Sequence, residues 1–331
     1  MKKKERMKIY TLLLGVLFVS PIQAQTMHDW ENHHVLQINR EPARAAFTPF
    51  SVQKGDGSIS LDGTWKFRWT PVPNERVMNF YQTNFNDKDW TDFPVPANWE
   101  VNGYGTPIYV SAGYPFKIDP PRVMGEPKTD YTTYKERNPV GQYRRTFVLP
   151  AGWEANGQTF LRFEGVMSAF YVWINGKRVG YSQGSMEPSE FNVTKYLKSG
   201  ENQISLEVYR YSDGSYLEDQ DFWRFGGIHR SIHLIHTPDI HVRDYAVRTL
   251  PASAGDYEDF ILQIDPQFSV YRGMTGKGYV LQGVLKDASG KEVATLKGDV
   301  EDMLDLEHKA SRMNEWYPQR GPRKMGRLSA I

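Results

Sequence analysis

Ala169-Phe-Tyr-Val-Trp-Ile-Asn-Gly-Lys-Arg-Val-Gly-Tyr181 is the segment that most clearly predicts the fold class. Its first half, residues 169–174, consists of apolar and aromatic residues that favour a β-strand. Asn175-Gly176 then favours a type I′ turn, because both residues tolerate a positive φ angle. With residues 177–181 as the partner strand, the segment predicts a β-hairpin.

Strand-like segments recur on both sides of this hairpin. Between Leu61 and Trp69, aromatic residues alternate with Lys66 and Arg68, which is the two-residue period of a half-buried strand. Further strands are expected at 142–149, 159–164, 203–209 and 228–236, and then at 240–250, 260–270, 278–286 and 292–300. Closely spaced strands with turn signals predict an all-β protein rather than a parallel α/β sheet.

We expect the chain to divide into three segments. Residues 1–24 are predicted to be a signal peptide, residues 25–238 a jelly-roll β-sandwich, and residues 239–331 an immunoglobulin-like β-sandwich. The boundary is placed at 236–239, because the strand pattern stops and restarts there. An immunoglobulin-like domain needs about seven strands. The sequence offers four, so we expect this second domain to be incomplete.

The first residues have the order of a bacterial secretory signal. A basic segment, 1–8, precedes an apolar run, 9–19, and small residues lead to a cleavage site after Ala24. The apolar run is shorter than the ~20 residues that span a bilayer. An uncleaved membrane anchor remains the alternative. The signal predicts export to the periplasm or the cell surface, where disulfides are allowed but not required.

Composition excludes several classes of function. Among 331 residues, 40 Lys and Arg balance 39 Asp and Glu, which argues against a nucleic-acid partner bound through a diffuse basic surface. A hydrophobic content of 40% with 14% aromatic residues is too high for a disordered chain. The absence of cysteine excludes disulfides, thiolate metal sites and a cysteine nucleophile.

Several motifs identify a family. They are Val95-Pro-Ala-Asn-Trp99, Pro107-Ile-Tyr109, Tyr114-Pro115, residues 175–181, Pro188-Ser-Glu-Phe191, Ser212-Asp-Gly-Ser-Tyr-Leu-Glu-Asp-Gln-Asp-Phe-Trp-Arg224 and Gly227-Ile228. From about Trp30 to about Val300 the chain resembles the large bacterial β-galactosidases of glycoside hydrolase family 2. The resemblance implies a jelly-roll sugar-binding domain, an immunoglobulin-like domain and then a catalytic TIM barrel. Only the first and part of the second fit within this chain.

The chemistry that the resemblance implies is retaining hydrolysis of terminal β-D-galactosides. Such hydrolysis needs two carboxyl groups about 5–5.5 Å apart, and in this family both are glutamates of the barrel. One of them stands in an Asn-Glu pair. The pair Asn314-Glu315 lacks the setting of a barrel strand, so we do not expect it to be catalytic. We expect no catalytic residue in this chain, and no activity from this chain alone.

Three carboxylates, Glu218, Asp219 and Asp221, form the main candidate site. Carboxylates accept hydrogen bonds from sugar hydroxyls or bind hard cations. From the residues alone, a loop whose charges are neutralised by Arg224 and Arg230 is an open alternative. The resemblance implies that Asp221 ligates a sodium ion and contacts the galactosyl 6-hydroxyl. Glu218 and Asp219 are expected to be structural partners.

Ser111 is the second candidate substrate-binding residue. In the family, an asparagine three residues before the Tyr-Pro pair contacts the galactosyl ring, and the matching position here is Ser111. Serine is shorter and has one donor where the amide has two. The resemblance further implies magnesium as a second cofactor of the full-length enzyme, a homo-oligomer, and the downstream barrel as a partner of this part.

Two other functions remain open. The chain could be an autonomous carbohydrate-binding protein of the lectin kind, or a structural module that serves only subunit contacts. A reading frame that continues into a barrel with two glutamates would favour the enzyme. Binding of galactose by a chain that stops at Ile331 would favour the lectin, and stable association without sugar binding would favour the structural module.

Overall fold

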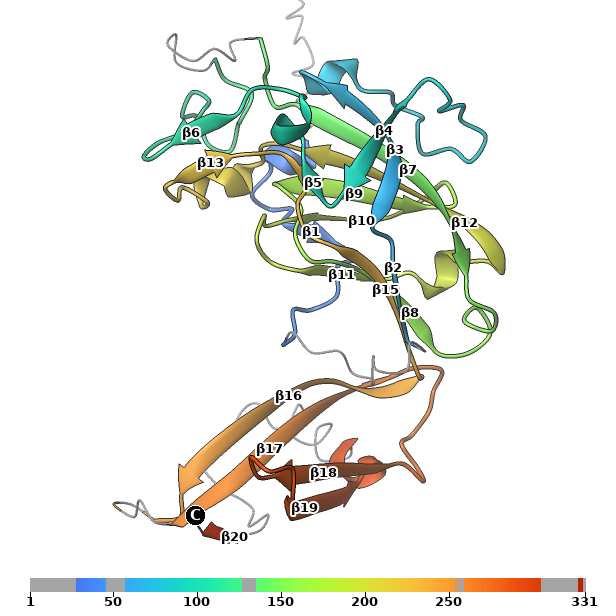
Figure 1. Ribbon diagram of the computed structural model, residues 1–331, viewed down its shortest axis with the longest axis vertical. Helices are drawn as coiled ribbons and strands as arrows, with labels where there is room; N and C mark the ends of the chain where they lie inside the picture. Colours follow the sequence, from blue (N-terminus) through green and yellow to red (C-terminus); the bar gives the residue numbers. More distant parts are fainter. Residues whose placement is uncertain are drawn as a thin grey trace, which may run out of the picture.

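The computed structural model describes residues 28–45, 57–126, 135–253, 255, 259–304 and 327–329. Two antiparallel sheets form its larger part (Figure 1). The first sheet has the order β1 (Gln37–Ile38), β10 (Lys177–Gln183), β9 (Ala169–Ile174), β12 (Gly200–Tyr209), β7 (Val140–Leu149), β3 (Gly63–Thr70) and β4 (Thr91–Val95). The second has the order β11 (Ser189–Asn192), β8 (Gln158–Phe163), β15 (Ile232–Thr237) and β2 (Ser58–Ser60).

Shorter elements join these strands. Two small sheets pair β13 (Phe222–Arg224) with β6 (Ile108–Val110), and β14 (Gly227–Ile228) with β5 (Ala97–Asn98). The 3₁₀ helices are η1 (Asp29–Glu31), η3 (Pro73–Glu75), η4 (Glu100–Asn102), η5 (Thr194–Tyr196) and η6 (Asp213–Tyr216). No helix of the described residues is both long enough and apolar enough to cross a membrane.

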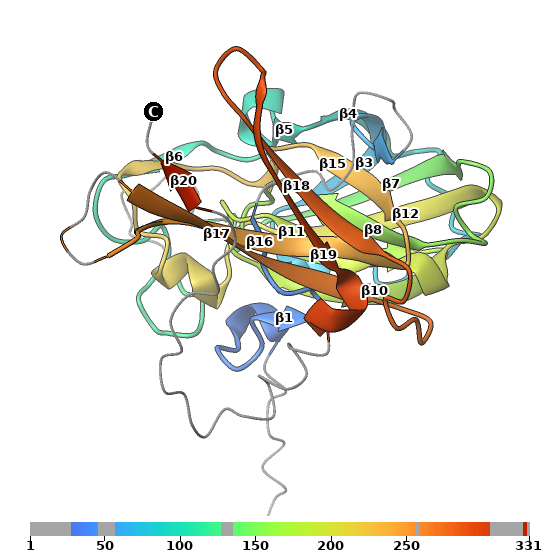
Figure 2. The same ribbon diagram turned by 90° about the horizontal axis from the view of Figure 1, so that it is seen from below.

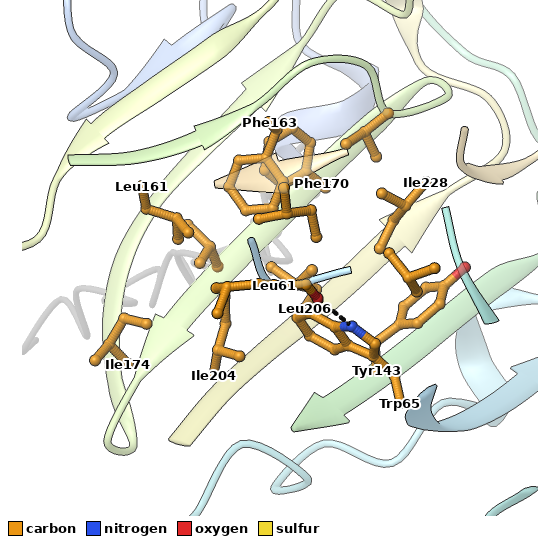
Figure 3. Packing of buried hydrophobic residues seen from close by; sticks show 14 of the residues in the cluster. Leu61, Trp65, Tyr143, Leu161, Phe163, Phe170, Ile174, Ile204, Leu206 and Ile228 are labelled. Carbon is orange, nitrogen blue, oxygen red and sulfur yellow. Dashed lines mark hydrogen bonds between the residues drawn. The ribbon is translucent and has the colours of Figure 1, made fainter. Parts of the chain in front are cut away.

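The main core lies between the two large sheets (Figure 3). Alternate residues of β9, Phe170, Val172 and Ile174, point into it and meet side chains of the second sheet such as Leu161 and Phe163. This follows from the two-residue period of a strand, which sends successive side chains to opposite faces. The sequence therefore forms a sandwich around one apolar layer.

The outer face of the seven-stranded sheet is also covered. Tyr171 and Trp173 of β9 belong to a second buried cluster, in which Trp30 stacks on Tyr209 with ring centroids 4.0 Å apart. Phe80, from the loop before β4, contacts Trp173 edge-on at 5.4 Å. All six residues of β9 are consequently buried, whereas a strand at a sandwich surface is usually buried on one face only.

The hairpin expected at 169–181 is present. Ile174 pairs with Lys177, and the turn residues Asn175 and Gly176 have φ angles of 50° and 78°. Two positive φ angles are the requirement of a type I′ turn. The predicted turn is confirmed.

The second part of the chain is built from antiparallel hairpins (Figure 2). Its strands are β16 (Ile240–Pro251), β17 (Asp259–Val270), β18 (Val280–Lys286), β19 (Glu292–Asp299) and β20 (Arg327–Ser329). A small core around Ile240, Val300 and Leu304 joins β17 to β18 through Phe268 and Leu281. The prediction of an all-β protein, a β-sandwich followed by immunoglobulin-like strands, is confirmed.

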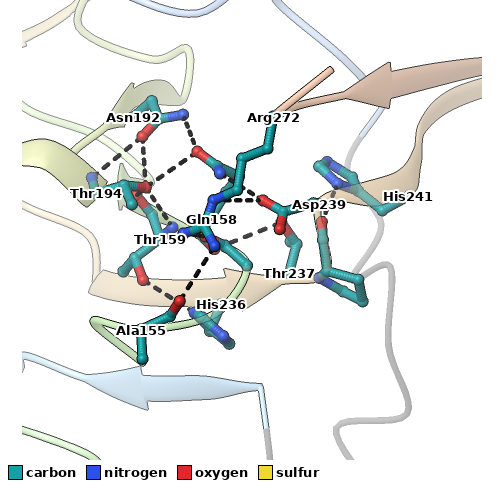
Figure 4. A network of polar contacts seen from close by, with 12 residues as sticks. Ala155, Gln158, Thr159, Asn192, Thr194, His236, Thr237, Asp239, His241 and Arg272 are labelled. Carbon is teal, nitrogen blue, oxygen red and sulfur yellow. Dashed lines mark hydrogen bonds and ion pairs between the residues drawn. The ribbon is translucent and has the colours of Figure 1, made fainter. Parts of the chain in front are cut away.

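A polar network joins the first sandwich to the second part (Figure 4). The amide of Gln158 donates to Asp239 at 2.7 Å, and Arg272 approaches the same carboxylate at 3.5 Å. A second set of contacts surrounds Glu190 of β11, which pairs with Arg44 at 2.9 Å and with Arg243 of β16 at 2.6 Å. These ion pairs connect three separate segments of sequence.

Some predictions fall on parts of the chain that the structure does not describe. The expected signal peptide at 1–24 lies outside the described residues, and so does the Asn314-Glu315 pair.

Candidate functional site

The acidic loop, defined here as residues 213–221, begins with η6, whose first turn is closed by a capping box between Ser212 and Ser215. Glu218 then accepts two hydrogen bonds of 2.6 Å from Ser185, one from its backbone N–H and one from its hydroxyl. Asp219 forms an ion pair with Arg224 at 2.8 Å. Glu218 thus ties the loop to the residues that follow β10, and Asp219 ties it to β13. Both contacts fit the expected role of structural partners.

Asp221 has a different environment. Its side chain is exposed, and its Oδ1 accepts a hydrogen bond from the phenol of Tyr109. Arg224 pairs with Asp219 instead, and Arg230 donates to the backbone oxygen of Met186 at 2.8 Å. Arg224 therefore holds the loop and Arg230 does not. In the described part of the chain, Oδ1 of Asp221 has Tyr109 as its partner and Oδ2 has none.

The strands β6 and β13 form a two-stranded ribbon, defined here as residues 108–111 with 221–224 (Figure 1). Tyr109 pairs with Trp223, and Val110 pairs with Phe222. Ser111 and Asp221 adjoin the last pair of this register, Val110–Phe222, so both lie at the same end of the ribbon. The hydrogen bond from Tyr109 places Asp221 on the face that carries this tyrosine.

Exposure confirms this division of the ribbon into two faces. On the inner face, Ile108, Val110 and Arg224 are 9%, 4% and 9% exposed. On the outer face, Tyr109 and Trp223 are 51% and 49% exposed, and Ser111 and Asp221 are exposed as well. The structure therefore brings Asp221 and Ser111 to one end of the ribbon. The outer face of the ribbon carries two aromatic rings, whose centroids are 5.7 Å apart.

A buried ion pair fixes the base of the ribbon. Arg210 and Glu100 are each 1% exposed at their side chains and lie 3.2 Å apart. Arg210 also donates to the backbone oxygens of Thr106, just before β6, and of Arg224, the last residue of β13. Burial raises the pKa of Glu100, although the charge of Arg210 and the N–H of Gly226 oppose this shift. One guanidinium thus holds both strands.

The described residues offer a cation few ligands here. A carboxylate oxygen such as that of Asp221 suits a hard cation, which usually takes six or more oxygen ligands. Yet no group of three or more His, Cys, Asp or Glu side chains within the described ranges could hold a metal ion. Asp221 fits the role of one ligand, and the others would have to be backbone oxygens, water or residues from elsewhere.

Three contacts of this site were not predicted from the sequence. They are the phenol of Tyr109 on Asp221, the double contact of Ser185 with Glu218, and the Arg210 link between β6 and β13. The alternation of Ile108 and Val110 with Tyr109 and Ser111 does indicate one exposed face. It does not indicate which strand pairs with it.

Comparison with known proteins gives the family. The model of the sugar binding domain of glycosyl hydrolases family 2 matches residues 59–238. A β-galactosidase of Priestia megaterium is 38% identical over 296 residues, which cover 85% of this chain and 27% of that protein. A β-galactosidase of Yersinia pestis is 41% identical over 234 residues, which cover 69% of this chain and 21% of that protein. The chain thus spans about a quarter of the length of these curated relatives.

Solved structures share the fold. A β-glucuronidase of an uncultured Clostridium species has a TM-score of 0.55 at 20% identity, and the match covers 78% of this chain and 40% of that one. A mutant of Bacteroides uniformis β-glucuronidase 2 has a TM-score of 0.56 at 22% identity, covering 73% and 26%. Because the family model matches more than half of the chain, residues 59–238, the expected membership is confirmed: this chain belongs to glycoside hydrolase family 2 and contains its sugar-binding domain.

Proposed function

We propose that this chain forms one wall of the substrate site of a retaining β-galactosidase. In this proposal Asp221 binds the galactosyl 6-hydroxyl and a sodium ion, and Ser111 contacts the sugar ring directly or through water. The observation that carries the proposal is that Asp221 and Ser111 are both exposed and lie at the same end of the ribbon. The similarity to curated β-galactosidases, at 38% and 41% identity, supports galactose as the sugar.

The bond-breaking groups are proposed to lie outside this chain. Retention requires a nucleophilic carboxylate and an acid/base carboxyl group about 5–5.5 Å apart, and in this proposal both belong to a downstream catalytic barrel. The full-length enzyme would then be a homo-oligomer with magnesium as a second cofactor. We further propose export to the periplasm or cell surface after cleavage at Ala24, on the evidence of the signal-like sequence.

Sodium has a physical reason to act through Asp221. A cation next to a carboxylate offsets the charge of the carboxylate and can also ligate a sugar hydroxyl, so the hydroxyl is held without loss of either contact. Asparagine keeps the shape of the side chain but removes its negative charge. The charge of Asp221 is therefore the quantity to test.

The test is Asp221→Asn in the full-length protein. We expect the sodium concentration for half-maximal hydrolysis of a chromogenic β-galactoside to rise about ten-fold, the effect of losing a charged ligand. Asp119→Asn is the matched control, since Asp119 is an exposed carboxylate paired with Arg122 at 3.3 Å. Unchanged sodium dependence in Asp221→Asn would contradict the proposal. A higher kcat/KM for a β-glucuronide than for the β-galactoside would contradict the choice of sugar.

An autonomous sugar-binding function is the second candidate. The exposed rings of Tyr109 and Trp223 beside Asp221 favour it, because aromatic side chains present apolar faces next to polar groups. Calorimetry of the 331-residue chain with galactose separates the two functions. Galactose binding by this chain alone would favour the autonomous function, and weaker binding in Asp221→Asn would place that site beside Tyr109 and Trp223.

A further inference from the structure

Tyr109 and Asp221 occupy diagonal positions on the outer face of the ribbon. Tyr109 is the register partner of Trp223, and Asp221 lies two residues before Trp223, immediately before β13 begins. Diagonal neighbours of this kind are within reach of long aromatic side chains. Here the phenol O–H of Tyr109 donates to Oδ1 of Asp221.

This hydrogen bond restricts an otherwise mobile group. Asp221 is exposed, and among the described residues its hydrogen-bond partner is Tyr109. A surface carboxylate without such a partner samples several rotamers. With Oδ1 fixed by a donor, Oδ2 is aimed in one direction, away from the phenol.

We propose that Tyr109 is the positioning residue of Asp221, because its phenol fixes one carboxylate oxygen and thereby directs the other toward a sugar hydroxyl or a cation on the outer face of the ribbon. The inference rests on the proposed function of Asp221 and adds the residue that orients it. Tyr109 itself does not need to touch the substrate.

Tyr109 is well placed for this role because rigid parts of the fold hold it. Its backbone is paired with β13, and its ring contacts Trp223. Arg210 links the two strands by donating to the backbone oxygens of Thr106 and Arg224. A positioning group must be held by the scaffold more firmly than the group it orients.

The functional test is a double-mutant cycle in the full-length protein. Tyr109→Phe keeps the ring but loses the hydroxyl, and it should raise KM and the sodium concentration for half-maximal activity about five-fold, with a smaller change in kcat. In the Asp221→Asn background the same substitution should have no further effect, since the group that it orients is already altered. Tyr104→Phe is the matched control, because its hydroxyl also makes a surface hydrogen bond, of 2.9 Å to Thr91.

The outcomes separate the two proposals. If Asp221→Asn raises the sodium requirement and Tyr109→Phe does not, the positioning role is wrong and the proposed function stands. An equal effect of Tyr109→Phe in both backgrounds would likewise overturn the positioning role. If Asp221→Asn leaves sodium dependence unchanged, the proposed function fails and this inference fails with it.

Discussion

Single residues of similar charge have very different tasks in this molecule. The carboxylate of Glu218 is hydrogen-bonded to Ser185, and that of Asp219 is paired with Arg224. Asp221, two residues after Asp219, is exposed and contacts Tyr109. Glu100, in contrast, is buried against Arg210. A buried charge is costly unless it is paired. The stability of the fold should therefore depend strongly on Arg210, which pairs with the buried Glu100.

We expect Arg210→Gln to lower the free energy of unfolding by about 3–5 kcal/mol at pH 7, because it leaves Glu100 buried without its counter-charge. Burial already raises the pKa of Glu100, and loss of Arg210 raises it further. A carboxyl group with a raised folded-state pKa contributes its stability below its unfolded value of about 4.5 and loses it as the pH rises. The destabilisation should therefore grow between pH 4.5 and pH 7.

Urea unfolding at both pH values measures this difference. Lys66→Gln is the control, since Lys66 and Asp92 form a pair at 2.7 Å whose side chains are 38% and 64% exposed. Exposed pairs contribute about 0–1 kcal/mol. A similar, pH-independent loss in both variants would show that the Arg210 pair is not the support we infer.

At the scale of elements, the local pattern of the sequence predicts strands better than it predicts their surroundings. Residues 169–174 and 240–250 were expected as strands and correspond to β9 and to most of β16. Alternation sets Arg144 on the polar face of β7, yet Arg144 is buried and pairs with Asp87 at 2.7 Å. The loop that covers Arg144 contains Asp87, 57 residues earlier in the sequence. A local sequence pattern carries no information on such distant contacts.

The same limit applies to the candidate site. A motif can identify Asp221 and Ser111 separately, because each stands in a characteristic segment. Their proximity depends on the register between β6 and β13, which are more than 100 residues apart in sequence. Pairing of distant strands is set by the packing of the whole sandwich and not by either segment. The same register brings Tyr109 close to Asp221, and no local pattern predicts that contact.

The hairpin between β9 and β10 gives a prediction for one element. Gly176 has a φ of +78°, and a Cβ there would meet Thr83 at an ordinary contact distance of 3.8 Å. Gly176→Ala should therefore cost only the left-handed backbone conformation, about 1–2 kcal/mol. Gly283→Ala in β18 is the control, because its Cβ also has ordinary contacts, 3.8 Å to Ile264, without a positive φ. Thermal unfolding that ranks the two variants in the opposite order would contradict this account of the turn.

At the scale of the whole molecule, the two parts are joined by buried charge. Glu190 on β11 of the first sandwich is 5% exposed and lies between Arg44 and Arg243, whose side chains are 4% and 12% exposed. The segment before Arg44 also contacts this residue, since the N–H of Glu41 donates to the backbone oxygen of Glu190 at 2.8 Å. This arrangement holds β16 against the first sandwich.

The last prediction concerns this junction and its dependence on pH. Burial tends to raise the pKa of Glu190, but the hydrogen bond of Arg44 and the charge of Arg243 outweigh it and hold the pKa below the ordinary value. A lowered folded-state pKa means that the contribution to stability is present above about pH 4.5 and is lost as the pH falls through the folded value. Glu190→Gln removes the charge at every pH, so it should lower the free energy of unfolding by about 2–4 kcal/mol at pH 7 and by less in acid.

Hydrogen exchange of Glu190→Gln tests whether this residue joins the two parts. The first residues of β16 should lose protection from exchange, while β9 should keep its protection. Asp265→Asn is the control, because it alters an exposed pair with Arg248 within the second part, and it should leave the protection of both strands unchanged. Equal loss of protection in β9 and β16 would mean that Glu190 supports the first sandwich as a whole and does not join the two parts.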